Sequence, residues 1–518
     1  MGVHGVMGRG LASVRGQVLA RTGIGVLGWF VLPEDVAAAA AGAAAAAGGR
    51  GVRLRARLVP AWLGVYFVLG LCLFSHLPYG QVLRELTAGL EGALAAAGWQ
   101  VPASTALTEV RRRVGEEPLK ALLGRVAGAL TACRAEWSHV GGLLAVAWDG
   151  TTVAVPDTAE NAAAFGKPAA GKKGGAAVSA GFPLVRLVAL VACGTRAVLD
   201  AGCGPVRGKG SGEQDLARGL LGSLGPGMLL LADRNFYSYS LRNAAAATGA
   251  DLLWRAKASM HLPVLRVLPD GSWLAHVSDP RAVQARCRKN GRRRRRGSKL
   301  GPETGPLPGI TVRVIEFWLT VTGQDGRTRT ESYRLITTLA DWREYPAAAL
   351  AAAYARRWAI ETIYAEFKTY LRGPGRRLRS QTPALARQEI WAYLIIYQAL
   401  RAIAAYAAAG QGLDPGRISF TATLRAARRT IPAARRDLTA ALAQAETEIT
   451  ADLAPPRPNR VCVRAVKQPR SAFTGKSNLK GPLSQTVTCT ATITPPGTTT
   501  PTTPSQPRQA KNQPQNPP

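Results

Sequence analysis

Acidic residues are scarce in this sequence. The 518 residues contain 32 Asp and Glu against 66 Lys and Arg, which leaves a formal net charge of +34 at pH 7. Such an excess repels itself unless a polyanion neutralises it, so nucleic acid is the expected partner. Cysteine is scarce too: the seven Cys form no C-x-x-C pair and have no nearby His to complete a zinc site. We therefore expect reduced, structural thiols.

Long uninterrupted apolar runs are also missing. The longest, residues 58–74 (LVPAWLGVYFVLGLCLF), is interrupted by Pro60 and two Gly. This composition favours a buried helix over the alternative of a membrane span. The apolar stretch at residues 23–32 lacks a convincing cleavage site after it, so secretion is not expected. A cytoplasmic protein without a membrane segment is predicted.

A chain of this length is expected to form roughly two to four structural units. Apolar residues at helical spacing, such as Val82, Leu86 and Leu90, predict a helical N-terminal domain. The tail is rich in Pro, Thr, Gln and Lys, which predicts disorder. The predicted order is a loose segment with an Ala/Gly tract (1–57), the helical domain (58–140), a first part of the catalytic core (141–261), a β-rich insertion with a basic loop (262–345), further core helices (346–410), a helical C-terminal region (411–453) and the disordered tail (454–518).

The central region alternates strands and helices. Buried strands are predicted at residues 143–149, 182–193, 228–233 and 251–257, with a helix at 212–224, which indicates a mixed α/β core. In the insertion, two alternating segments flank Asp325-Gly326, a dipeptide typical of a β-hairpin turn.

Two aspartates follow apolar strands of this predicted core. Asp149 (AWDG) and Asp233 (LADRNF) are each placed at the end of a strand, where a rigid base can present a carboxylate to a divalent cation. The alternative is that each Asp only ends its strand as a turn former. Their occurrence in one sheet favours the metal site.

A third feature lies in a segment of strong helix formers, AAAYARRWAIETIYAEFKTYL. In a regular helix, steps of 3, 4 and 7 residues place its four polar members within an arc of about 60°; they are Tyr354, Arg357, Glu361 and Lys368. The alternative is an exposed face with one i,i+4 ion pair. Three carboxylates with adjacent cations can instead hold two Mg²⁺ ions and a phosphate, which is the equipment for attack on a phosphodiester.

The spacing Y-x2-R-x3-E-x6-K of these four residues matches the signature of insertion-sequence-four family transposases. The stretches WDGTTVAVPDTAENAAAFG and LADRNFYS look like the aspartate motifs of that family. Residues 58–86 also resemble its N-terminal domain, so the resemblance spans roughly residues 20 to 440. The tail has no counterpart.

The resemblance implies an α/β fold with an RNase H-like mixed sheet, a β-rich insertion and flanking helical regions. It implies a catalytic and metal-binding triad, Asp149, Asp233 and Glu361, that holds Mg²⁺, with two ions expected and Mn²⁺ as an alternative. Tyr354, Arg357 and Lys368 would grip DNA.

The implied reaction frees a 3′-hydroxyl at the transposon ends, which then attacks target DNA. The implied partners are double-stranded DNA, as end repeats and as target, and a second copy of the chain in a homodimer on paired ends. The implied location is the bacterial cytoplasm, in association with the nucleoid.

Further residues are assigned with alternatives. Trp318 in the insertion is a candidate to stack on a flipped base, the alternative being a core side chain. The basic run at residues 286–299 is expected to be a disordered loop that contacts DNA non-specifically through Arg292, Arg293, Arg294, Arg295 and Arg296. Glu366 is expected to point away from the signature face into solvent.

Two rival functions stay open from the sequence. One is a non-catalytic or decayed sequence-specific DNA-binding protein, and the other is an RNase H-like nuclease without strand transfer. The sequence sets neither the terminal repeat nor the target preference.

Overall fold

The computed structural model describes residues 23–46, 59–88, 91–96, 98–131, 138–168, 181–208, 210–257, 259–295, 304–323, 328–373, 375–454 and 486–496. The chain divides into two compact units. The first comprises Met1–Trp254 and Ala353–Pro456, and the second comprises Arg255–Ala352 and Arg457–Pro518. Both combine strands and helices.

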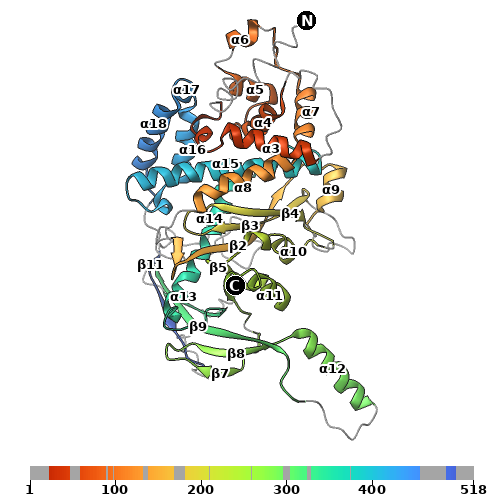
Figure 1. The fold of residues 1–518 in the computed structure, drawn as a ribbon, viewed down its shortest axis with the longest axis vertical. Coiled ribbons are helices and arrows are strands. Elements are labelled where there is room, and N and C mark those ends of the chain that lie inside the picture. Colours follow the sequence, from red (N-terminus) through yellow and green to blue (C-terminus); the bar gives the residue numbers. More distant parts are fainter. Residues whose placement is uncertain are drawn as a thin grey trace, which may run out of the picture. The chain divides into compact units, whose positions relative to one another are not determined.

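A mixed sheet lies at the centre of the first unit (Figure 1). Its strands run in the order β4-β3-β2-β5-β6. The first three are antiparallel neighbours, whereas β5 is parallel to β2 and to β6. The bounds are β1 (His139–Val140, paired with β2), β2 (Leu143–Ala154), β3 (Leu184–Ala192), β4 (Val198–Pro205), β5 (Met228–Ala232) and β6 (Asp251–Arg255). The α/β, RNase H-like mixed sheet predicted from the sequence is confirmed.

Strand β2 is continuous, whereas the sequence predicts a turn after Asp149 before the segment TTVAVPD continues the strand. It does not end at Asp149 but continues through Gly150 to Ala154. The reason is its partner β3, which pairs with it along the whole stretch from Val146 to Ala154. The β-branched residues after Gly150 suit this pairing. The parallel partner β5 is shorter and pairs only with residues 144–147 of β2.

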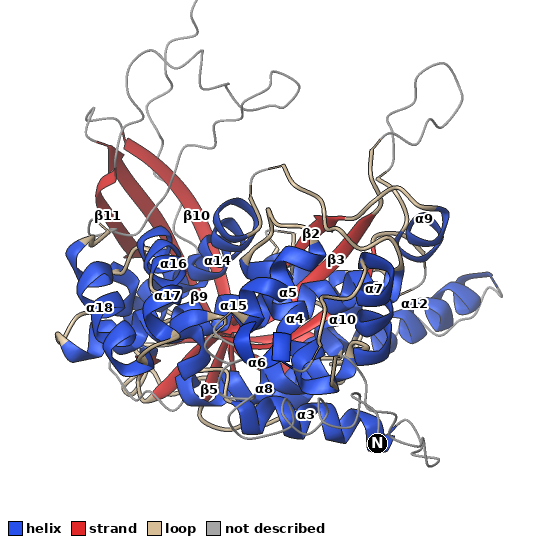
Figure 2. Ribbon diagram, turned by 90° about the horizontal axis from the view of Figure 1, so that it is seen from above, coloured by secondary structure: helices blue, strands red, loops and turns tan. Residues whose placement is uncertain are grey.

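Helices surround this sheet, as Figure 2 shows in blue. The long helix α15 (Pro383–Gly410) contacts α4, α8 and β4 and lies between the N-terminal helices and the sheet (Figure 1). The other helices of the unit are η1 (Gly25–Trp29), α3 (Pro33–Ala46), α4 (Ala61–Leu73), α5 (Tyr79–Thr87), α6 (Glu91–Ala96), α7 (Ser104–Val114), α8 (Glu117–Thr131), α9 (Ala159–Phe165), α10 (Glu213–Arg218), α11 (Tyr239–Ala246), η7 (Pro415–Arg417), α16 (Phe420–Arg429), α17 (Ile431–Ala434) and α18 (Leu438–Ala451). Four more segments, around the signature, are described with the site.

The most apolar helices are core helices. In the described part of the chain, α15 alone is long and apolar enough to cross a membrane, and 89% of its apolar window is buried inside the protein. The predicted buried helix at residues 58–74 is α4, whose side chains from Leu63 to Leu73 are all buried. Apolar surface that is removed from water in this way drives folding of the unit.

The loose start predicted at the N-terminus is wrong for residues 23–36, whereas the weak helix expected in the Ala/Gly tract from Ala37 does form as far as Ala46. Here η1 and α3 form, and Val26 and Leu27 of η1 are fully buried. The segment packs on the C-terminal helices α17 and α18. The apolar stretch GIGVLGWFVL thus finds its partner far away in sequence, which local composition does not reveal.

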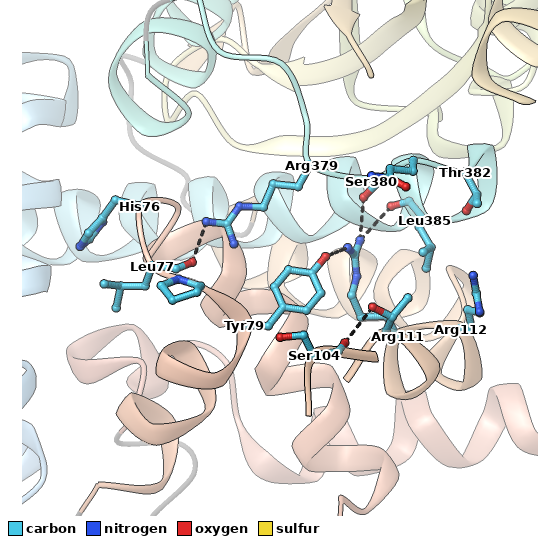
Figure 3. A pocket seen from close by; sticks show the side chains of 13 residues that line it. His76, Leu77, Tyr79, Ser104, Arg111, Arg112, Arg379, Ser380, Thr382 and Leu385 are labelled. Atoms are coloured by element: carbon cyan, nitrogen blue, oxygen red, sulfur yellow. Dashed lines mark hydrogen bonds between the residues drawn. The ribbon is translucent and has the colours of Figure 1, made fainter. Parts of the chain in front are cut away.

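Arg111 of α7 joins the N-terminal helices to α15. Its side chain is 1% exposed. Its guanidinium donates to the Tyr79 hydroxyl at 2.6 Å, to Ser380 Oγ at 2.8 Å and to Gln388 Oε1 at 3.1 Å. These bonds border a cavity of about 660 Å³ that lies between α5, α7 and the start of α15 (Figure 3). Arg111 is therefore a structural cation with its donors satisfied.

The second unit contains antiparallel strands and a helix. Its strands follow the order β10-β9-β8-β7, with β11 also paired to β9. The predicted hairpin is confirmed: β9 and β10 pair from Arg313↔Thr337 to Thr322↔Thr328. Arg313, fully buried, pairs with Asp270 and so fixes one side of β9. The bounds are β7 (Val264–Val267), β8 (Trp273–Ser278), α12 (Pro280–Arg295), β9 (Gly309–Gly323), β10 (Thr328–Thr337) and β11 (Thr486–Ile493).

Two predictions for this unit are corrected. The basic run is not a disordered loop at residues 286–295, because α12 extends through it. Arg and Lys are good helix formers, and Gly291 alone does not outweigh them. The tail is not disordered at residues 486–493, where the β-branched sequence TVTCTATI pairs with β9 as β11. Arg296 lies outside the described residues.

We predict that Arg111→Met lowers the free energy of unfolding by roughly 2 to 4 kcal/mol, because it leaves buried acceptors such as Gln388 Oε1 without a donor. Urea denaturation of the full chain measures this change. The neighbouring Arg112 is exposed and pairs only with Glu109. Arg112→Met should therefore cost less than about 0.5 kcal/mol, and equal losses in both variants would contradict the role assigned to Arg111.

Candidate active site

The register of β2 against β5 brings two aspartates together. Ala147 pairs with Leu231 in this parallel ladder. Asp149 and Asp233 each stand two residues further along their strands, so they occupy neighbouring positions just beyond the last pair. Asp233 directly follows β5 and begins the short helix η4 (Arg234–Phe236).

Arg357 connects the third predicted carboxylate, Glu361, to Asp149. Glu361 lies in the first turn of α14 (Ala359–Ala365), and Arg357 lies in the preceding 3₁₀ turn η5 (Ala355–Trp358). Arg357 Nη1 is 3.7 Å from Asp149 Oδ2, and Nη2 is 3.8 Å from Glu361 Oε1. The Arg357 side chain is 8% exposed. One buried guanidinium thus links the first and third predicted carboxylates.

The signature segment is not one regular helix as predicted. It comprises α13 (Ala347–Tyr354), η5, α14 and a π-helix, η6 (Glu366–Leu371). The arc calculated from 3.6 residues per turn therefore does not apply. The Tyr354 hydroxyl donates to the carbonyl of Ala232 at 3.3 Å, which anchors the segment at the end of β5. Lys368 lies in η6 and is half-buried.

Burial governs the electrostatics of Asp149. It raises the pKa of this carboxyl from 3.8 to about 6. The backbone N–H of Gly150, which donates to Oδ1 at 2.8 Å, and the charge of Arg357 both oppose the rise. Glu213 and Glu361 add to it. Burial is thus the main cause of the raised pKa, and Glu213 and Glu361 add smaller contributions that a bound cation would offset.

The neighbouring carboxylates also act on the pKa of Arg357. Burial acts to lower its pKa, but Tyr354, Asp233, Asp149 and Glu361 overcome that effect, so the pKa of Arg357 is raised. The guanidinium stays charged and is the internal counter-ion of the site.

The donor set fits a hard divalent cation. Carboxylate oxygens are the ligands that Mg²⁺ and Mn²⁺ prefer. Asp233 Oδ1 is buried and has no hydrogen-bond partner among the described residues, which leaves it as an orphaned acceptor. In the described ranges, however, no three His, Cys, Asp or Glu side chains converge closely enough to enclose an ion. Arg357 stands between Asp149 and Glu361 in this arrangement.

A fourth carboxylate, Glu213, was not anticipated from the sequence. It begins α10 and forms an ion pair with Arg186 of β3 at 2.8 Å. Its carboxylate lies against Gly150, where a Cβ atom would collide with it. The signal available in the sequence was the Gly that directly follows the first aspartate, because a residue without a side chain admits a close neighbour.

The prediction that Glu366 is solvated is wrong. It is 4% exposed, pairs with Arg196 at 2.9 Å and accepts a hydrogen bond from the Tyr397 hydroxyl at 2.8 Å. The interval from Glu361 to Glu366 is α-helical, so Glu366 does point away from Glu361, but that side of the segment packs on α15 and not on solvent. Glu366 is thus a structural tie between η6 and α15.

The predicted DNA contacts of the insertion are placed only in part. Trp318 is half-buried on β9, between Ser332 of β10 and Thr492 of β11. Arg292, Arg293, Arg294 and Arg295 belong to the last turn of α12, and their side chains lie outside the described residues.

We predict that Asp149→Asn stabilises the metal-free protein at neutral pH. Because the pKa of Asp149 is raised from 3.8 to about 6, the stability it contributes is complete below the lower value and is lost as pH rises through the higher one. The Asn variant should gain roughly 1 to 3 kcal/mol in unfolding free energy near pH 7 and nothing at a pH below the ordinary value. Urea denaturation at both pH values decides, and a loss at neutral pH would show that Arg357 outweighs burial.

Comparison with known proteins places these residues in a family. The family model for the insertion element 4 transposase N-terminal region matches residues 29–124, and that for the transposase DDE domain matches residues 141–399, half of the chain. Transposase InsG for insertion sequence element IS4, from Escherichia coli strain K12, is 27% identical over 352 residues, which cover 68% of this chain and 71% of that protein. InsZ of the same strain, named provisionally as a transposase, is 28% identical over 204 residues, 39% of this chain and 62% of InsZ.

These matches confirm the predicted family and the predicted class of enzyme. DDE transposases act on DNA and depend on a divalent metal ion. The chain therefore belongs to the insertion-sequence-four family of DDE transposases.

Proposed function

We propose that this transposase cuts DNA at the ends of its element and joins them to target DNA, with Asp149, Asp233 and Glu361 as the metal-binding catalytic triad. The observation that carries the assignment is the β2–β5 register, which makes the two aspartates neighbours, together with the Arg357 bridge from Asp149 to Glu361. Mg²⁺ is the proposed ion, two per site, with Mn²⁺ as the alternative. The hard oxygen donors and the orphaned Asp233 Oδ1 support this choice.

Bound at these carboxylates, divalent cations would activate the attacking oxygen and stabilise the leaving oxygen of an in-line displacement. The first displacement is hydrolysis: water breaks the bond between phosphorus and the 3′-oxygen and frees a 3′-hydroxyl. In the second, that hydroxyl attacks a target phosphate and displaces a new 3′-hydroxyl of the target strand.

The protein residues hold the geometry for these steps. The Tyr364 hydroxyl donates to the backbone carbonyl of Asp149 at 2.6 Å, and Tyr354 fixes the other end of the segment on Ala232. Arg357 balances the charge of Asp149 and Glu361 and is the residue of this group that would pair with a DNA phosphate.

The remaining proposed contacts are with the DNA outside the triad. Lys368 grips the DNA near the cut, Trp318 stacks on a displaced base, and the basic run including Arg292–Arg296 neutralises phosphates. A homodimer that pairs two ends, working on the bacterial nucleoid, completes the proposal. Its support is the net charge of +34 and the half-buried position of Trp318 on β9.

We predict that Asp149→Asn, Asp233→Asn and Glu361→Gln each lower cleavage by at least about a thousandfold, because each removes the charge of a metal ligand with little change of shape. The assay uses purified protein, Mg²⁺ and a plasmid that carries the element's ends. Binding to an end duplex, measured in parallel, should stay within about threefold of wild type.

The matched control is Asp157→Asn, because Asp157 is a carboxylate close to the first motif that pairs with Lys167 at the surface. This variant should cut at the wild-type rate. Retained cleavage in any triad variant would remove that residue from the site. Nicking without joined products in the wild type would favour a nuclease, and retardation of DNA without cutting would favour a binding protein.

A further inference from the structure

Arg372 is a buried arginine without partners for most of its donors. It follows η6 directly and is 8% exposed. Its Nε and Nη1 atoms are buried and have no hydrogen-bond partner among the described residues. Buried charges in folded proteins are normally paired or hydrogen-bonded, so a guanidinium in this state requires an explanation.

The nearest acid does not supply one. Glu389 of α15 acts on the charge of Arg372, but its carboxylate oxygens accept from the backbone N–H of Arg379 at 3.1 Å and of Ser380 at 3.1 Å, and also from Ser380 Oγ. No ion pair joins Glu389 to Arg372 within the described residues. Tyr393, the other group that acts on Arg372, has a pKa raised by burial and is uncharged.

A second cation stands beside Arg372. Lys368 precedes it by four residues, which is just under one turn of a helix with i→i+5 hydrogen bonds, so the two side chains leave the segment in similar directions. Burial, and after it the positive charge of Arg372, lowers the pKa of Lys368. The described residues provide no hydrogen bond or ion pair to Lys368 Nζ either. Two neighbouring cations without an acid between them repel each other, and an anion placed at both would relieve the repulsion.

Other buried arginines of this unit show the usual arrangement. Arg111 has three side-chain acceptors. Arg401 donates through Nε and Nη2 to the carbonyls of Thr195 and Pro415, and only its Nη1 lacks a partner among the described residues. These residues tie segments together, whereas the Arg372 guanidinium ties to nothing described. Arg372 thus differs from them because most of its donors have no acceptor among the described residues. A planar guanidinium is the side chain best shaped to donate hydrogen bonds to two phosphate oxygens at once.

We propose that Arg372 and Lys368 together bind one phosphate of the DNA at the transposon end, so that Arg372 is a DNA ligand in addition to the three signature residues assigned to DNA. This inference rests on the proposed function, which assigns a DNA contact to Lys368. The phosphate takes the place of the missing acid. Lys368 contributes a point charge and Arg372 a planar pair of donors.

The test measures binding of the full-length protein to an end duplex over a series of salt concentrations, with thermal melting of the free protein in parallel. Arg372→Met should weaken binding at least about tenfold at physiological salt and reduce the slope of log K against log salt by about 0.9, the value for one phosphate. Its melting temperature should stay equal or rise, because an unpaired buried charge is removed. Arg372→Lys should restore most of the slope.

Two control variants distinguish this from a structural role. Arg401→Met should lower the melting temperature and leave the salt slope unchanged, because that arginine has its acceptors inside the protein. Lys368→Met should reduce the slope by the same amount as Arg372→Met, and the double variant by no more than either single one, because both cations share one phosphate.

The outcomes separate the two proposals. A lower melting temperature with an unchanged slope in Arg372→Met, or failure of that variant to fold with no rescue of the slope by Arg372→Lys, overturns the phosphate site. If Arg372→Met behaves in this way while Lys368→Met still reduces the slope, the proposed role of Lys368 stands without Arg372. An unchanged slope in Lys368→Met would remove the parent assignment itself.

Discussion

The parallel pairing of β2 with β5 is the constraint on which the site depends. Its last backbone pair, Ala147 with Leu231, lies two residues before Asp149 and two before Asp233. The Tyr354 and Tyr364 hydroxyls then attach the signature segment to the carbonyls of Ala232 and Asp149, which are backbone atoms of the same two strands. The third carboxylate is therefore positioned by reference to the first two.

This arrangement holds the Asp149 carboxyl largely out of water, whereas the Glu361 side chain is 40% exposed. The raised pKa of Asp149 measures the cost, and Arg357 and the Gly150 amide offset part of it. Function and stability are opposed here, because the charges that would bind cations are those that the empty fold tolerates least. Lys368 and Arg372 show the same conflict with positive charges: the cations proposed to bind DNA are unfavourable in the protein without DNA.

Much of the site could be predicted from the sequence, because strand-end aspartates and a spaced signature are local patterns. The proposed triad, Asp149, Asp233 and Glu361, comes from such patterns, and the β9–β10 hairpin predicted from Asp325-Gly326 is confirmed by the strand pairing. The errors arose where the structure of a segment depends on contacts with residues far away in sequence. Strand β2 continues past Asp149 because β3 pairs with it, β11 forms because β9 accepts it, and η1 is ordered because α17 and α18 cover it. Glu366 and Glu213 were missed because the packing of the first on α15 and the contact of the second with Gly150 are not visible in composition.

The π-helix η6 has a consequence for how the signature spacing should be understood. Six residues separate Glu361 from Lys368, but part of that interval is wound more loosely than an α-helix. A relative with the same six-residue spacing but an unbroken α-helix would therefore direct its lysine to a different side of the helix. Deletion of one residue from the π-helix would convert it to an α-helix and rotate Lys368 and Arg372 about the helix axis, although all four signature residues would still be present. The function of the motif thus depends on the direction of its side chains around the helix axis as well as on their identity.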